Sequence, residues 1–131
     1  WPGTIPAGSE CSEIVGSIDL MPTFARIVGT STPYDLIIDG MDILPLMQGR
    51  SDARSPHQSY FYYRGRKLEA MRQGFWKIRF NKTIELFHLG HDLSETENLA
   101  SKYPARVRSM LKEMEAFDLS LRANARPEGQ L

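Results

Sequence analysis

Between residues 59 and 89, short apolar and aromatic runs alternate with turn-forming residues. The four runs are Ser59–Arg64, Leu68–Arg72, Trp76–Phe80 and Ile84–Leu89. Runs that recur every 8–10 residues or so, with Gly or Asn between them, are typical of strands joined by tight turns. The pattern therefore predicts a small antiparallel sheet. In its first strand, Tyr60 and Tyr62 should face one side, and Phe61 and Tyr63 the other.

A helical period replaces this pattern near the end of the chain. Pro104 stands where a helix can begin, because its missing N–H costs little in the first turn. Beyond it, apolar residues recur at three- and four-residue steps, namely Val107, Met110, Leu111, Met114, Phe117 and Leu121. We predict a helix whose apolar stripe covers one face of the sheet, followed by a polar, frayed tail at 124–131.

The first part of the chain shows neither a series of strands nor a long helical period. Residues 1–9 hold two Pro and two Gly, which is typical of an irregular connector. We interpret Ser12–Ile18 as a short strand and Asp19–Val28 as a helix with Asp19 at its N-cap and Gly29 at its end. One face of this helix is apolar, and we expect packing to bury it: Leu20, Phe24, Ile27 and Val28.

A polar stretch at 49–58 separates the two regions and is interpreted as a linker. The predicted organisation is a first part at 1–48, the linker, a sheet-and-helix subdomain at 59–123 and the tail at 124–131. The fold class is α+β. The strand and helix of the first part have no partner in the predicted sheet. Together with the opening Trp1-Pro2-Gly3, they favour a segment of a longer protein.

The composition narrows the classes of function. The 131 residues include 16 Lys and Arg against 16 Asp and Glu, which gives no net charge and a pI near 7.0. This balance argues against nucleic-acid binding and against a polybasic membrane anchor. No apolar run approaches the roughly 20 residues that span a bilayer. Cys11 is the single cysteine, which excludes an internal disulfide and a cysteine-based zinc cluster.

No complete catalytic constellation appears in the sequence, so we predict no catalytic or metal-binding residue. A metal site at His88 and His91 would need a third ligand, and no residue has a clear claim to that role. Partial burial or exposure is the simpler account of His57, His88 and His91. Asp39 and Asp42 could bind a hard cation, but turn-forming and helix-capping roles explain both. Cys11 has no nearby activating group and is interpreted as a small apolar side chain.

The run Tyr62-Tyr63-Arg64-Gly65-Arg66 is the best candidate for ligand binding. Aromatic faces beside guanidinium groups suit an anionic or sugar ligand. A strand end followed by a solvated turn explains the same residues, so both interpretations stay open. Asn81-Lys82-Thr83 also matches the acceptor pattern for N-glycosylation, a triplet that often arises by chance.

A series of short motifs follows one another in a characteristic order: Trp1-Pro2-Gly3, Ile5-Pro6-Ala7-Gly8, Ile18-Asp19-Leu20-Met21-Pro22-Thr23, Asp39-Gly40-Met41-Asp42, Leu44-Pro45-Leu46, Ser55-Pro56-His57, Phe61-Tyr62-Tyr63-Arg64-Gly65, Met71-Arg72, Gly74-Phe75-Trp76-Lys77, Glu85-Leu86-Phe87-His88-Leu89, and Asp92 with Glu95, Asn98 and Leu99. This order resembles the C-terminal part of formylglycine-dependent sulfatases, especially the arylsulfatase and N-acetylgalactosamine-6-sulfatase branch. Each motif alone is weak evidence for this family, whereas the shared order of the motifs over roughly residues 1–105 is specific evidence for it.

The resemblance implies an alkaline-phosphatase-like main domain followed by a smaller C-terminal domain. Residues 1–48 would be the last strand, helix and linking turn of the main domain, and 59–123 the C-terminal sheet and helix. The implied activity is hydrolysis of a sulfate ester on a sulfated sugar or an aryl sulfate, with calcium and formylglycine in the full-length parent. The C/S-x-P-x-R motif that yields formylglycine is absent here, so this chain alone should be inactive.

The resemblance also implies partners and a compartment. The partners are the main sulfatase domain and a sulfated small molecule or glycan, without nucleic acid or membrane. The compartment is periplasmic, extracellular or lysosomal. Tyr63 and Arg64 would contact the substrate at the wall of the cleft, the ring against a sugar and the guanidinium against anionic oxygens.

Two alternatives to a sulfatase segment remain open. One is an autonomous module that binds a glycan or a partner, and the other is a segment of a related phosphate or phosphonate ester hydrolase. Apolar surface exposed at Leu20, Phe24 and Ile27 favours a segment of a larger enzyme. Burial of Leu20 and Phe24 within the chain itself favours the autonomous module.

Overall fold

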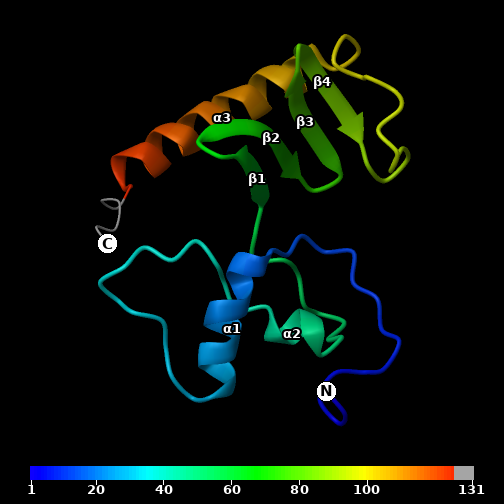
Figure 1. Ribbon diagram of the computed structural model, residues 1–131. Helices are drawn as coiled ribbons and strands as arrows, with labels where there is room; N and C mark the ends of the chain where they lie inside the picture. The colour runs from blue at the N-terminus through cyan, green and yellow to red at the C-terminus, as the bar shows by residue number, and fades with distance from the viewer. Residues whose placement is uncertain (126–131) are drawn as a thin grey trace. The chain divides into compact units, whose positions relative to one another are not determined.

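The structure is a computed structural model that describes residues 1–125, and it divides into two compact units, 1–58 and the chain from Ser59 onward (Figure 1). The first unit is built of short helices and long connections, and the second of a sheet and one long helix. Most of the predicted polar tail at 124–131 lies outside the described residues.

The second unit is a four-stranded antiparallel sheet in which each strand pairs with the next along the chain. Its strands are β1 (Ser59–Arg64), β2 (Lys67–Gln73), β3 (Trp76–Asn81) and β4 (Thr83–His88), and its helix is α3 (Pro104–Ala123). The predicted sheet and covering helix are confirmed, and every strand boundary falls within one residue of its predicted place. Turn chemistry explains this accuracy, since Gly65 and Gly74 both adopt the left-handed conformation that tight turns need.

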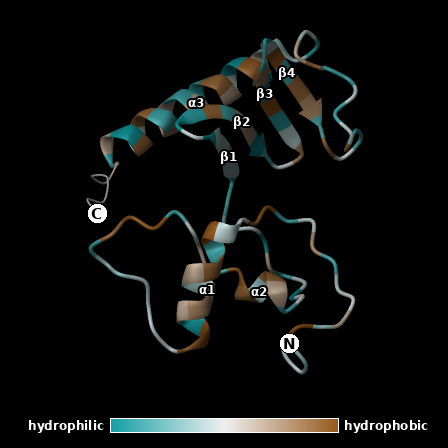
Figure 2. Ribbon diagram, viewed as in Figure 1, coloured by the Kyte–Doolittle hydropathy of each residue, from teal (hydrophilic) through white to brown (hydrophobic). Residues whose placement is uncertain are grey.

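Helix α3 covers one face of the sheet and closes an apolar core. The register aligns Phe61 with Met71, Met71 with Ile78 and Ile78 with Leu86, so one row crosses all four strands. From α3, Met110 and Met114 complete the buried cluster. Each fully buried side chain of this size contributes about 1.5–3 kcal/mol. Figure 2 shows hydrophobic residues along β3 and β4, next to a helix that alternates between hydrophobic and hydrophilic positions.

The predicted alternation in β1 is confirmed by ring contacts. Phe61 stacks on Phe117 of α3 with 3.7 Å between ring centroids, and Tyr63 lies tilted against the same ring. Tyr62 faces the opposite side, where its ring lies 5.5 Å from Lys77 Nζ. The predicted apolar stripe of the helix includes one residue too many at its C-terminal end, because Leu121 is exposed. The last described contacts of α3 with the sheet come from Phe117 and Asp118.

The first unit holds a 3₁₀ turn η1 (Ser17–Asp19), helix α1 (Leu20–Ile27) and the short helix α2 (Leu44–Met47). The predicted helix ends as expected, with Gly29 in the left-handed conformation (φ 77°). The predicted strand at 12–18 is not formed within the described residues. A strand needs a neighbour for its backbone N–H and C=O groups, and residues 1–125 supply none for this segment.

The apolar face of α1 is uncovered. Leu20 is 41% exposed and Phe24 is 53% exposed, Val28 is exposed as well, and only Ile27 of the predicted face is half-buried. The one buried residue of the helix is Thr23. Within residues 1–125, the apolar face that the sequence assigns to packing therefore stays largely uncovered. The exposure is the outcome that favours a segment of a larger enzyme over an autonomous module.

Candidate functional site

The turns between β1 and β2 and between β3 and β4 lie at the same end of the sheet, because successive turns of an antiparallel meander alternate between its ends. Gly65 (φ 59°) lies in the first turn. Lys82 (φ 56°) lies in the second and is a non-glycine residue in the left-handed region, which is uncommon. Next to these turns lies a hollow lined by side chains of β1, β2 and β3.

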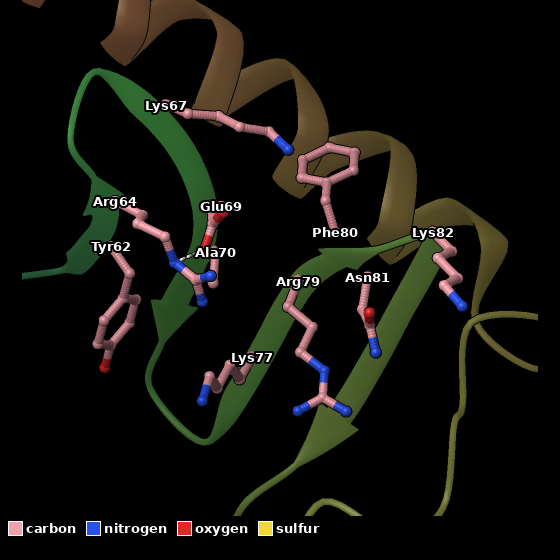
Figure 3. A pocket seen from close by; sticks show the side chains of 10 residues that line it. All are labelled: Tyr62, Arg64, Lys67, Glu69, Ala70, Lys77, Arg79, Phe80, Asn81 and Lys82. Carbon is pink, nitrogen blue, oxygen red and sulfur yellow. Dashed lines mark ion pairs between the residues drawn. The ribbon is translucent and has the colours of Figure 1, made fainter.

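This hollow encloses about 570 Å³ and is shown from close by in Figure 3. We call it the basic hollow, and it is lined by Tyr62, Arg64, Lys67, Glu69, Ala70, Lys77, Arg79, Phe80, Asn81 and Lys82. Five of these residues are Lys or Arg, and one is acidic. The sign of the charge therefore suits an anionic ligand.

A β-bulge shapes the wall of the basic hollow. The register shifts between Tyr62 and Tyr63, which leaves Glu69 as an extra residue in β2. The Oε2 atom of Glu69 lies 3.1 Å from Nε of Arg64. Because the Arg64 side chain is 84% exposed, this pairing leaves its remaining N–H groups accessible to a ligand.

Two cations that line the basic hollow, Lys77 and Arg79, form ion pairs with carboxylates, and we call them the floor cations. The Lys77 Nζ atom lies 2.5 Å from Glu95 Oε1, and Arg79 Nη1 lies 2.8 Å from Glu95 Oε2. Arg79 Nε also lies 2.6 Å from Glu85 Oε2 on the neighbouring strand. The hydrogen bond to Glu85 raises the pKa of Arg79. These pairs fix the floor cations in place and neutralise much of their charge.

Lys67 and Lys82 differ from the floor cations. Lys67 is the first residue of β2, next to the first turn, and Lys82 lies in the second turn; both side chains are exposed. Within residues 1–125, neither ammonium group lies within ion-pair distance of a carboxylate. Figure 3 shows Lys67 extending toward Phe80, with Lys82 at the far end of β3. Their charges are the part of the basic hollow that a ligand can still neutralise.

The structure separates the two residues that the sequence suggested for substrate contact. Arg64 lines the basic hollow, whereas Tyr63 faces α3. The Tyr63 hydroxyl donates a hydrogen bond to Asp118 Oδ1 at 2.9 Å. Burial, reinforced by this bond, raises the pKa of Tyr63 to about 12. Tyr62 is the aromatic residue beside Arg64 in the hollow, and the alternation along β1 was the signal that pointed to it.

A second polar feature lies inside the first unit. The carboxylate of Asp19 accepts backbone hydrogen bonds from Gly16 N and Met41 N, both at 2.8 Å. Its Oδ1 atom also lies 2.7 Å from His57 Nε2. Asp19 is fully buried, and the His57 side chain is 8% exposed. We call Asp19, Thr23, Met41, Ile43 and His57 the polar cluster.

The polar cluster joins segments that are distant along the chain. Thr23 Oγ1 donates to the Asp19 carbonyl and accepts a hydrogen bond from Ile43 N. Burial alone would raise the pKa of Asp19, but the bonds from Met41, Gly16 and His57 outweigh it and lower the pKa. Asp19 was predicted as a helix cap, which is wrong for its side chain, because no side-chain cap bond reaches α1. The buried, paired state of His57 was not foreseen.

The other candidate residues do not assemble into a site. His88 and His91 stack on each other, and within residues 1–125 no three His, Cys, Asp or Glu side chains could hold a metal ion together. Asp42 accepts a hydrogen bond from Leu44 N, the first residue of α2, whose N-cap residue is Ile43. Cys11 is exposed, so it is not packed as the small apolar side chain that the sequence suggested.

Comparison with known proteins identifies the class to which this fold belongs. Residues 1–119 match the protein family described as N-sulphoglucosamine sulphohydrolase, C-terminal. The chain is 38% identical to human arylsulfatase D over 94 residues, which is 67% of this chain and 15% of that protein. It is 36% identical to dog N-acetylgalactosamine-6-sulfatase over 103 residues, which is 76% of this chain and 19% of that protein.

A solved structure confirms the architecture. Ps i-CgsB in complex with k-i-k-neocarrahexaose matches with a TM-score of 0.77 and 27% identity, over 98% of this chain and 29% of that chain. The chain therefore belongs to the sulfatase C-terminal family, and the predicted fold class is confirmed. It spans less than a fifth of the length of the two curated relatives. In residues 1–125, no helix has the length and apolar character to cross a bilayer.

Proposed function

We propose that this chain is the C-terminal part of a sulfuric ester hydrolase that acts on a sulfated sugar or an aryl sulfate. The observation that carries the proposal is the family match over residues 1–119, together with the likeness to arylsulfatase D and N-acetylgalactosamine-6-sulfatase. The catalytic groups belong to the parent enzyme. This chain completes the fold and supplies a wall of the substrate cleft.

The uncovered face of α1 supports the structural part of this role. Leu20 and Phe24 expose large apolar side chains, and a protein gains about 25 cal/mol for each Å² of apolar surface that it buries. The main domain of the parent is the partner that covers them. The chain alone keeps its second unit folded around its own core, while its first unit depends on this partner.

The parent enzyme carries calcium and formylglycine, and this chain does not supply their site. Its described residues offer no group of three metal-binding side chains. Cys11 stands in Cys11-Ser12-Glu13-Ile14-Val15, which lacks the Pro and Arg of the formylglycine motif. The compartment that suits this enzyme is the periplasm, the extracellular space or the lysosome.

Substrate contact from this chain is assigned to Arg64 in the basic hollow. Its exposed N–H groups can donate to sulfate oxygens, and Tyr62 places a ring on the same wall. Tyr63 supports this wall from the other side through its bond to Asp118. A ligand reaches Tyr62 and Arg64 without breaking any bond within the core.

The test is sulfate release by the full-length protein that contains this chain. With 4-nitrophenyl sulfate and N-acetylgalactosamine 6-sulfate as substrates, we expect turnover by the full-length protein and none by residues 1–131 alone. Release of phosphate from 4-nitrophenyl phosphate without release of sulfate would place the parent among phosphate ester hydrolases. Sulfate release by the isolated chain would contradict the proposed division of roles.

A further inference from the structure

The motif Asn81-Lys82-Thr83 lies where β3 turns into β4 (Figure 3). Asn81 is the last residue of β3, Lys82 forms the turn, and Thr83 is the first residue of β4. All three residues are exposed. Of the three asparagines in the chain, Asn81 alone is followed two positions later by Ser or Thr. The acceptor pattern for N-linked glycosylation is therefore presented on the surface, in a tight turn.

The backbone of this turn brings the two functional groups of the pattern together. Lys82 adopts the left-handed conformation (φ 56°), and the chain reverses around this single residue. Asn81 and Thr83 are consequently direct partners in the ladder between β3 and β4. Direct partners in antiparallel strands carry their side chains on the same face, with Cβ atoms about 4.5–5.5 Å apart. The Asn81 amide and the Thr83 hydroxyl are therefore neighbours.

The face that carries these two groups is turned away from the apolar core of the second unit. Ile78 is fully buried in that core. Side chains alternate along β3, so Arg79 and Asn81 face the other side. A bulky group attached to Asn81 therefore displaces no side chain of the core.

The Asn81 side chain is also chemically available. Within residues 1–125, its amide group has no hydrogen-bond partner. The other two asparagines differ in this respect. The Asn98 side chain accepts hydrogen bonds from two backbone N–H groups, and Asn124 Nδ2 donates to a backbone carbonyl. Modification of Asn81 therefore breaks no bond that holds the fold together.

We propose that Asn81 is an N-linked glycosylation site of the full-length protein. In this reaction Nδ2 of Asn81 forms a bond to C1 of an oligosaccharide that is carried on a lipid diphosphate. The bond between C1 and the diphosphate breaks, the diphosphate leaves with the electron pair, and the amide loses one proton. The inference takes only the compartment from the proposed function, because the extracellular space and the lysosome are both reached through the secretory pathway in which this transfer occurs.

The test is peptide mapping by mass spectrometry of the full-length protein secreted from cultured mammalian cells. Peptide N-glycosidase F removes N-linked glycans and converts the glycosylated asparagine to aspartate, so the peptide that contains residue 81 records the modification in its mass. We expect this peptide to carry a glycan in most molecules before treatment and an aspartate afterwards. A peptide with unmodified Asn81 in most molecules would overturn the proposal.

Four variants separate the acceptor from the turn around it. Asn81→Gln removes the acceptor amide and Thr83→Ala removes the neighbouring hydroxyl, and both should abolish the glycan on this segment. Lys82→Gln keeps the pattern, and Asn124→Gln changes an exposed asparagine outside it, so both should leave the modification unchanged. A glycan that persists in Thr83→Ala, or one that is lost in Lys82→Gln, would contradict the assignment.

Two measurements keep the outcomes distinct. Glycan transfer takes place in the endoplasmic reticulum, so a variant that is retained in the cells gives the same readout from the lysate as from the medium. Sulfate release from 4-nitrophenyl sulfate is measured on the same preparations. Glycosylation of Asn81 without sulfate release contradicts only the proposed function, whereas sulfate release by a protein with unmodified Asn81 contradicts only this inference.

Discussion

Each of the two units of this chain is stabilised internally by a different kind of interaction. The second unit closes an apolar core between a meander and a helix, with Met71, Ile78 and Leu86 fully buried. The first unit buries Asp19 and Thr23 in hydrogen bonds and leaves Leu20 and Phe24 exposed. The second unit therefore has an apolar core that can stabilise it, whereas the first unit leaves the apolar face of α1 uncovered within the described residues.

The largest effect is expected in the core of the second unit. Met110→Asp places a charge among buried apolar side chains and should lower the free energy of unfolding by about 4 kcal/mol or more. Phe117→Asp should cost less, because Phe117 is only partly buried. Arg108→Ala on the exposed side of α3 should change stability by less than about 0.5 kcal/mol. Denaturant unfolding measures all three, and the reverse ranking would show that the faces of α3 are wrongly assigned.

The next effect is expected in the polar cluster. Asp19→Ala leaves His57 without its carboxylate and leaves Met41 N and Gly16 N without an acceptor. Breaking a buried pair of this kind costs about 3–5 kcal/mol. The loss should be confined to the first unit, so hydrogen exchange should accelerate in α1 and not in β3.

The control for this variant is Asp39→Ala, which removes an exposed carboxylate nearby in the sequence. It should leave exchange in both units unchanged. If Asp19→Ala also accelerated exchange throughout the sheet, the two units would not be energetically separate.

A smaller effect is expected on how the stability of each unit depends on pH. The pKa of Asp19 is lowered in the fold, so its contribution is complete above its unfolded pKa of about 3.9 and is lost as pH falls further. The pKa of Tyr63 is raised to about 12, so its contribution is complete below its unfolded pKa of about 10 and is lost as pH rises toward 12. Acid should therefore weaken the first unit, and alkali the second.

Stability curves against pH check this contrast. Asp19→Asn should flatten the acid limb, and Tyr63→Phe should flatten the alkaline limb. A Tyr63→Phe variant that changed the acid limb instead would contradict the assignment of that group.

Local pattern explains why the second unit was predicted well. Its strands are short, their turns contain Gly65 and Gly74, and Pro104 marks the first residue of α3, so neighbouring residues carry the information. The contact between Tyr63 and Asp118 could not be read in the same way. Alternation states that Tyr62 and Tyr63 face opposite sides, but it does not state which side the helix covers.

The first unit was predicted less well for two physical reasons. Asp19 and His57 are 38 positions apart, and no local rule links an aspartate at a helix start to a histidine in a later connection. The apolar positions of α1 were read correctly as a packing face, but periodicity does not say which chain segment does the packing. The strand expected at 12–18 fails for a related reason, because a strand is defined by a neighbour as well as by its own residues.

We propose that the uncovered face of α1 packs against the rest of a sulfatase. Hydrogen exchange in residues 20–28 tests it most directly, measured in residues 1–131 alone and in the full-length protein under the same conditions. We expect fast exchange of α1 in the isolated chain, strong protection of α1 in the full-length protein, and equal protection of β3 in both. Equal exchange of α1 in the two proteins would contradict it, because the helix would then gain nothing from the remainder of the enzyme.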